Sequence, residues 1–80
     1  MSYSDNEIRL KKILEETFET NDINLNDSMD DIPEWDSFKH ILLLTKIEKE
    51  FNIKLEMNDF TEMISIPIIK SKILKYLDEK

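Results

Sequence analysis

The chain has 80 residues, with 18 acidic and 11 basic side chains and a formal net charge of −7. This charge argues against binding to nucleic acid or to an anionic membrane, because both need a basic patch on the protein. Cysteine is absent, which excludes disulfides, thiolate metal sites and a cysteine nucleophile. We expect a single cytoplasmic domain over residues 1–80, monomeric and without membrane insertion, since no apolar run reaches the roughly 20 residues that span a bilayer.

The first predicted helix covers about residues 5–20. Ser4 and Glu7 have the spacing of a capping box at its start. The apolar residues expected on its buried stripe are Ile8, Ile13, Leu14 and Phe18. Asn21 is the expected left-handed residue at its end.

Residues 21–36 show no helical period and are rich in Asn, Asp and Ser. Such a connection is long for a compact domain. Its scattered apolar residues predict that it is pinned across the helices, with Trp35 as the last anchor. Pro33 keeps Ile32 extended, so no helix should pass through it.

The strongest helical pattern runs from Ser37 to Phe51, with Asp36 as N-cap and Asn52 at its end. The residues expected on its buried stripe are Leu43, Leu44, Ile47 and Phe51.

A short third helix is predicted within residues 57–63. The last helix follows Ser65 as its N-cap, with Pro67 in the first turn. Its expected inward stripe consists of Ile69, Ile73, Tyr76 and Leu77. The predicted fold is therefore all-α, a four-helix bundle with three longer helices, one short third helix and a long first loop.

Two kinds of chemistry can be weighed from the residues alone. Ser37 and His40 are three residues apart and can share a helix face, but a hydrolase also needs an oxyanion hole and a substrate cleft. We therefore expect no catalytic residues and a solvent-exposed His40. Asp22, Asn24 and Asn26 match the first three ligand positions of a calcium loop.

The calcium pattern then fails at two required positions. Its sixth residue is Asp27 instead of glycine, and its twelfth is Pro33, with Glu34 one place too late. A solvated loop with no metal site is the favoured interpretation, and a cation-binding regulatory domain remains the weaker alternative.

Ser37 occupies the first position of a predicted helix, directly after an aspartate cap and a long surface loop. Backbone N–H groups and the helix dipole favour a phosphate at such a position. The hydroxyl can serve as a covalent attachment point or merely help to cap the helix.

The chain resembles the acyl carrier protein family over nearly its whole length. Asp36-Ser37-Phe38 stands where that family has Asp-Ser-Leu, and the Ile47-Glu48-x-x-Phe51 spacing follows. Asp59, placed before the short third helix, extends the match. The resemblance implies an acyl-carrier-protein-like fold and a 4′-phosphopantetheine arm joined to Ser37 through a phosphodiester.

The same resemblance implies the partners and the cargo. A phosphopantetheinyl transferase would install the arm from coenzyme A, and its thiol would carry an acyl or aminoacyl group as a thioester. The domain would catalyse nothing itself and would present its cargo to an acyl- or aminoacyl-activating ligase, an acyltransferase or a ketosynthase. The expected docking residues are Asp36, Phe38, Lys39, Leu42 and Glu48.

Within that set, Asp36 and Glu48 match acidic positions that meet basic partner surfaces. Lys39 and Leu42 stand where carriers of fatty-acid synthesis usually have acidic residues, which favours a dedicated pathway such as polysaccharide decoration, a specialised lipid or a secondary metabolite. Phe38 also occurs at its position in carriers of D-alanine, so an aminoacyl cargo stays open.

Four apolar residues complete the expectations. Phe38 should be partly buried near Trp35, and the other three should be core or cargo-lining residues: Met57, Met63 and Ile64. The structural alternative to a carrier is a four-helix protein-interaction adaptor that lacks the arm.

Overall fold

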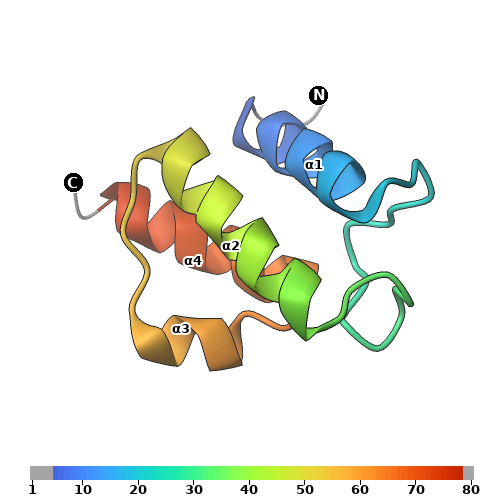
Figure 1. The fold of residues 1–80 in the computed structure, drawn as a ribbon. Coiled ribbons are helices and arrows are strands. Elements are labelled where there is room, and N and C mark those ends of the chain that lie inside the picture. Colours follow the sequence, from blue (N-terminus) through green and yellow to red (C-terminus); the bar gives the residue numbers. More distant parts are fainter. Residues whose placement is uncertain (1–4, 79–80) are drawn as a thin grey trace.

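The structure, a computed structural model, describes residues 5–78. It contains four helices, α1 (Asp5–Phe18), α2 (Ser37–Phe51), α3 (Met57–Glu62) and α4 (Ile66–Asp78) (Figure 1). No strand occurs within this range, so the all-α prediction is confirmed. No helix in residues 5–78 combines the length and apolar character needed to cross a membrane.

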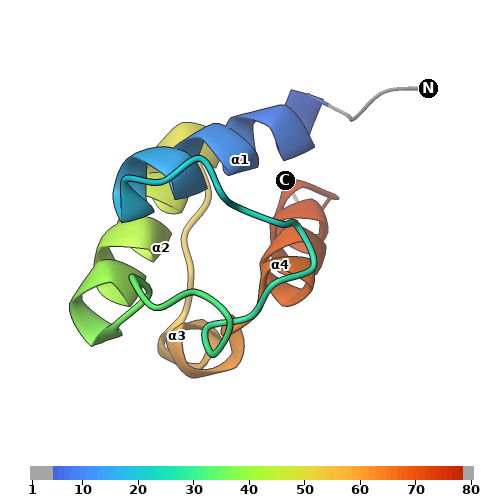
Figure 2. The ribbon, with the colours of Figure 1, turned by 90° about the vertical axis from the view of Figure 1, so that its right-hand side faces the viewer.

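The helices enclose one apolar core. In Figure 1, α1 lies beside α2, α4 lies behind α2, and the short α3 lies below them; Figure 2 shows the long α1–α2 connection crossing the side between α1 and α4. The buried apolar side chains come from every helix except α3 and from the connections: Leu10, Ile13, Leu14, Phe18, Ile23, Ile32, Trp35, Leu43, Leu44, Ile47, Phe51, Ile53, Leu55, Met63, Ile66, Ile69 and Ile73.

Helix α1 differs from its prediction at both its stripe and its end. Ile8 is 55% exposed, whereas Leu10 and Thr17 are buried, because Ile8 lies about 160° around the helix from Leu10. The left-handed residue is Glu19, with φ 54°, and not Asn21. The expected capping serine, Ser4, lies outside the described residues.

The long connection is fixed by backbone hydrogen bonds to the segment between α3 and α4. Met29 N donates to Ile64 O (2.8 Å), and Ile66 N donates to Asp27 O (2.9 Å). These bonds flank a single β-bridge between residues 28 and 65. With Trp35 3% exposed, the prediction of a loop pinned across the helices is confirmed.

Helix α2 begins and ends at the predicted residues. The Asp36 side chain accepts a hydrogen bond from Lys39 N (2.8 Å), as an N-cap does. Asn52, with φ 53°, takes the left-handed conformation that ends the helix.

The start of α4 also follows its prediction. Ser65 Oγ accepts from Ile68 N at 3.3 Å, and Pro67 lies in the first turn, where its missing N–H breaks no helical bond. Ile69 and Ile73 are buried, and Tyr76 packs against the core with part of its surface exposed.

Candidate functional site

Ser37 is the first residue of α2 and is exposed. Its hydroxyl makes no hydrogen bond to any residue of the described range, whereas Asp36 provides the helix cap. Asp36, and not the Ser37 side chain, therefore caps α2, which was the structural alternative to covalent attachment at Ser37. The start of α2 presents an accessible, unengaged hydroxyl beside the positive end of a helix dipole.

The first turn of α2, which contains Ser37, is held to the end of α1 by the Lys39 side chain. Lys39 Nζ donates to Thr17 O at 3.0 Å and pairs with the Glu19 carboxylate at 3.4 Å. Thr17 O is one of the carbonyls at the end of α1 that lack a helical partner, so Lys39 satisfies a group that would otherwise need water. This lysine therefore joins two helices and is not a free positive charge at the site.

A buried polar contact fixes the next turn of α2. Trp35 Nε1 donates to His40 Nδ1 at 3.0 Å, so His40 Nε2 carries the proton and donates to Phe60 O. The Trp35 ring also packs against Phe18, with ring centroids 5.4 Å apart. His40 is thus a link between the loop, α2 and α3.

These contacts correct the sequence-based view of His40. The side chain is 8% exposed and not solvent-exposed, and it does not share the exposed face of Ser37. Both ring nitrogens are already bonded, which leaves none to accept a proton from Ser37. The signal that could have revealed this role is positional, because Trp35 and His40 occupy the two positions of a hydrophobic staple around the cap.

The predicted docking residues behave in two ways. Asp36 and Glu48 are engaged within the chain, because Glu48 Oε2 accepts from Leu55 N at 2.8 Å. Phe38 is 72% exposed, so the expectation of partial burial near Trp35 is wrong. Phe38 is the second residue of α2. The first turn is held to the rest of the fold by the side chains of Lys39 and His40, so Phe38 is left on the solvent side of the helix.

Two apolar residues near Ser37 project beyond the core. Leu42 is half-buried, while Ile41 is 57% exposed and was not among the predicted site residues. The signal for Ile41 was present in the sequence, since it lies three residues after Phe38 and therefore on the same face.

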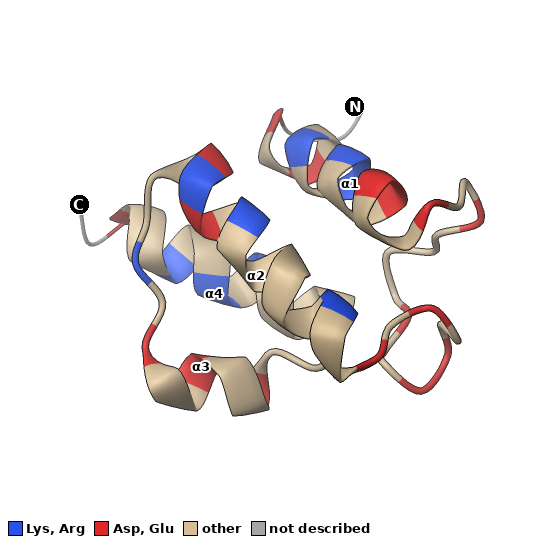
Figure 3. Cartoon of the chain, viewed as in Figure 1, with Lys and Arg blue, Asp and Glu red and all other residues tan. Residues whose placement is uncertain are grey.

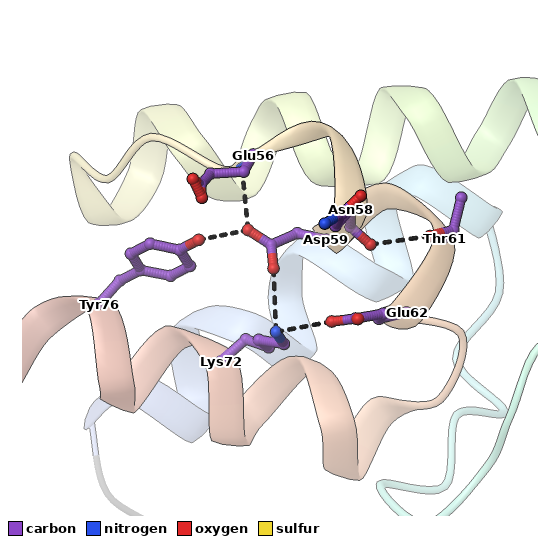
Figure 4. Close-up of polar contacts among 7 residues, drawn as sticks. All are labelled: Glu56, Asn58, Asp59, Thr61, Glu62, Lys72 and Tyr76. Atoms are coloured by element: carbon purple, nitrogen blue, oxygen red, sulfur yellow. Dashed lines mark hydrogen bonds and ion pairs between the residues drawn. The ribbon is translucent and has the colours of Figure 1, made fainter.

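Helix α3 is attached through a carboxylate. Asp59 is 4% exposed and is the only buried residue within α3. It accepts hydrogen bonds from Glu56 N (2.8 Å) and from the Tyr76 hydroxyl, and it pairs with Lys72 at 3.0 Å (Figure 4). Asp59 therefore lies inside α3, at its third position, and not before it as expected.

The charge state of this cluster follows from its contacts. Burial raises the pKa of Asp59, but the hydrogen bonds from Tyr76 and Glu56 N–H and the Lys72 ammonium outweigh it and lower the pKa below its ordinary value. The bond to Asp59 raises the pKa of Tyr76 to about 12. Hydrogen bonds to Glu62 and Asp59 raise the pKa of Lys72. At neutral pH Asp59 and Lys72 are thus charged, and Tyr76 is neutral and donates its hydroxyl proton to Asp59.

Three apolar residues around α3 separate into different environments. Met63 is fully buried, as expected of a core residue. Met57 is 87% exposed and Ile64 46% exposed, so neither is a core residue, and of the two expected roles only that of a cargo-lining residue is left for them. Met57 is the first residue of α3, and Ile64 lies two residues after its end; α3 itself buries only Asp59.

Polar side chains of the α1–α2 connection, residues 19–36, accept hydrogen bonds from backbone N–H groups a few residues away. Asn26 N donates to Asn24 Oδ1, and Ser28 N donates to Asp31 Oδ2, both at 2.9 Å. These bonds are typical of turns. Among residues 5–78 no group of three or more His, Asp or Glu side chains is placed to hold a metal ion.

A hollow of about 150 Å³ opens between α1 and α4 and shares no residue with α2. The Glu7–Lys70 ion pair (2.6 Å) lies in its wall. Its lining residues are Asn6, Glu7, Leu10, Lys70, Ile73 and Leu74.

Comparisons with protein-family models, curated proteins and solved structures found no match to this chain.

Proposed function

We propose that this chain is an acyl carrier domain with a four-helix bundle fold of the acyl-carrier type. In this proposal Ser37 Oγ bears a 4′-phosphopantetheine arm, which supplies the thiol that carries an acyl or aminoacyl group as a thioester. The observation that carries the proposal is the exposed Ser37 hydroxyl at the start of α2, which bonds to no residue in the described part of the chain and follows the capping Asp36.

Attachment is a transfer from coenzyme A by a separate transferase. Ser37 Oγ forms a bond to the phosphorus next to pantetheine, the bond from that phosphorus to adenosine 3′,5′-bisphosphate breaks, and the hydroxyl proton leaves to a base of the transferase. The sequence has no cysteine, so thioester chemistry needs such an added thiol.

The chain's own residues have supporting roles in this proposal. Asp36 occupies the N-cap, so Ser37 is not needed there, and the start of α2 favours the negative charge of a phosphodiester. Lys39 and His40 hold the first turn of α2 against α1, the loop and α3. Ser37 is thus mounted on a fixed point of the fold.

The test is covalent modification of the purified protein by coenzyme A and a broad-specificity phosphopantetheinyl transferase. Intact-mass measurement should show one added phosphopantetheine on the wild type and none on Ser37→Ala. Ser71→Ala, which removes an exposed hydroxyl on α4, should be modified like the wild type. A wild-type protein left unmodified by several transferases would overturn the proposal.

Ser37→Ala also distinguishes the carrier from the alternative function, a protein-interaction adaptor without the arm. Exposed Phe38 suits a protein-interaction surface whether or not Ser37 is modified. An adaptor would retain full biological activity as Ser37→Ala, whereas a carrier would lose it completely.

A further inference from the structure

His40 is the one histidine of the chain, and its two hydrogen bonds fix its charge state. The indole N–H of Trp35 can only donate, so the His40 Nδ1 that faces it at 3.0 Å must be an unprotonated acceptor. The carbonyl oxygen of Phe60 can only accept, so Nε2 must carry the proton. Both bonds are therefore made only by one neutral tautomer of the ring.

Protonation of His40 conflicts with one of these two contacts. In an imidazolium both ring nitrogens are donors. The bond from Nε2 to Phe60 O survives protonation, whereas the new N–H at Nδ1 points at the indole N–H of Trp35. The bond between α2 and α3 is thus kept, and the bond between α2 and the end of the α1–α2 connection is lost.

The charged groups around this contact do not compensate for a proton on His40. Residues 37–45 of α2 contain one charged side chain, that of Lys39, and Figure 3 shows this half of the helix uncoloured except at that position. Lys39 has the wrong sign to hold an imidazolium. The acidic groups of the surrounding elements are Glu19 at the end of α1, Glu34 and Asp36 in the connection, and Asp59 and Glu62 on α3.

These carboxylates are occupied or exposed. Glu19 pairs with Lys39, Asp36 accepts from a backbone N–H as the cap of α2, and Asp59 and Glu62 pair with Lys72. Glu34 is exposed, whereas His40 is buried. Within residues 5–78 no carboxylate forms an ion pair with His40.

We propose that Trp35 and His40 form an acid-sensitive latch. When His40 gains a proton, the Trp35 side chain leaves its place against α2, and residues 32–36 loosen while the four helices stay folded. Histidine is the side chain whose charge ordinarily changes between about pH 5 and 8, so the latch would respond to mild acid. The inference stands apart from the carrier function, because it needs no group attached to Ser37.

The burial of Trp35 is the reason why loss of one bond displaces the whole side chain. Trp35 is 3% exposed and packs between Phe18 and His40, with ring centroids 5.4 and 5.9 Å away. A buried indole N–H without an acceptor is unfavourable, and movement toward water relieves it. The start of α2 stays attached through Lys39 and through Phe60 O, so the change is confined to the connection before Ser37.

The experiment follows both partners of the latch in the wild type, where one histidine and one tryptophan make the signals unambiguous. Nitrogen NMR should show the His40 ring gaining a proton as the pH falls from about 7.5 to about 5. The Trp35 Nε1–H signal should shift with the same midpoint and exchange faster with solvent. Acrylamide quenching of Trp35 fluorescence should rise about twofold over this range, with the helical circular dichroism unchanged. The pKa of Asp59 lies below 3.8, so its cluster stays charged throughout.

His40→Gln is the matched variant. Its amide can accept from the indole N–H and donate to Phe60 O, but it gains no proton in this range. Its Trp35 signals should therefore be constant with pH. If this variant does not fold, the NMR titration of the wild type decides alone.

Three results would overturn the latch. One is a Trp35 signal that stays constant while His40 gains its proton, and another is a His40 ring that stays neutral until the helices unfold. The third is an equal pH response in His40→Gln, which would assign the change to carboxylates. None of these measurements involves modification of Ser37, so failure of the latch and failure of the carrier proposal are separate results.

Discussion

Asp59 offers a sharp test of how α3 is held, because an acidic side chain is the one buried group of that helix. Hydrogen bonds to a charged group contribute about 1.5–3 kcal/mol each, and Asp59 accepts them from Glu56 N, the Tyr76 hydroxyl and the Lys72 ammonium. Asparagine keeps one accepting oxygen without the charge. We therefore expect Asp59→Asn to lower the free energy of unfolding by about 2 kcal/mol.

This loss is large for a domain of this size. At about 0.05–0.15 kcal/mol per residue, 80 residues correspond to roughly 4–12 kcal/mol in total. A change of about 2 kcal/mol should lower Tm by about 8–16 °C.

Urea and thermal unfolding of four proteins provide the measurement: wild type, Asp59→Asn, Tyr76→Phe and the double variant. Because the two side chains share a hydrogen bond, the cycle should give a coupling energy of about 1–2 kcal/mol. Glu16→Gln is the control, since Glu16 is exposed on α1, away from the Asp59 cluster, and its loss of charge should leave the midpoint unchanged. Additive single variants, or an Asp59→Asn midpoint equal to that of the wild type, would refute the reasoning.

Three further predictions follow from single contacts. Hydrogen bonds hold the pKa of Asp59 below its ordinary 3.8 in the folded state. The stabilisation by Asp59 is therefore present above that pH and is lost as the pH falls through the lowered pKa. Asp59→Asn should reduce the decrease in the free energy of unfolding that urea unfolding measures between about pH 5 and pH 2. Thr17 Oγ1 is buried and has no hydrogen-bond partner within residues 5–78, so Thr17→Val should raise the free energy of unfolding by about 1 kcal/mol, and a lower Tm would contradict this. Trp35→Phe removes the donor to His40 Nδ1 and should cost at least about 1–3 kcal/mol, measured by circular dichroism because the chain has one tryptophan; an unchanged midpoint would show that this bond adds nothing.

Local signals in the sequence were sufficient for both ends of α2 and for the start of α4. Asp36 and Asn52 mark the two ends of α2 because a side-chain cap and a left-handed residue each satisfy nearby backbone groups. Ser65 and Pro67 did the same for the start of α4. The exposed position of Ser37 followed from the cap that precedes it.

Contacts between distant residues were not available from such signals. The end of α1 falls at Glu19, where φ is 54°, although asparagine two residues later has the better intrinsic preference. His40 was expected to be exposed because its bonds depend on Trp35 and Phe60, which only the folded chain brings to it. The internal use of Glu48 by Leu55 N was hidden for the same reason.

The three attachments around the first turn of α2 also bear on how far Ser37 itself can move. Asp36, Lys39 and His40 tie that turn to its own backbone, to α1 and to α3. A group attached to Ser37 would thus pivot about a stationary centre. The effective concentration of that group at a bound enzyme would then be set by the length and stiffness of the tether, and very little by internal motion of the domain.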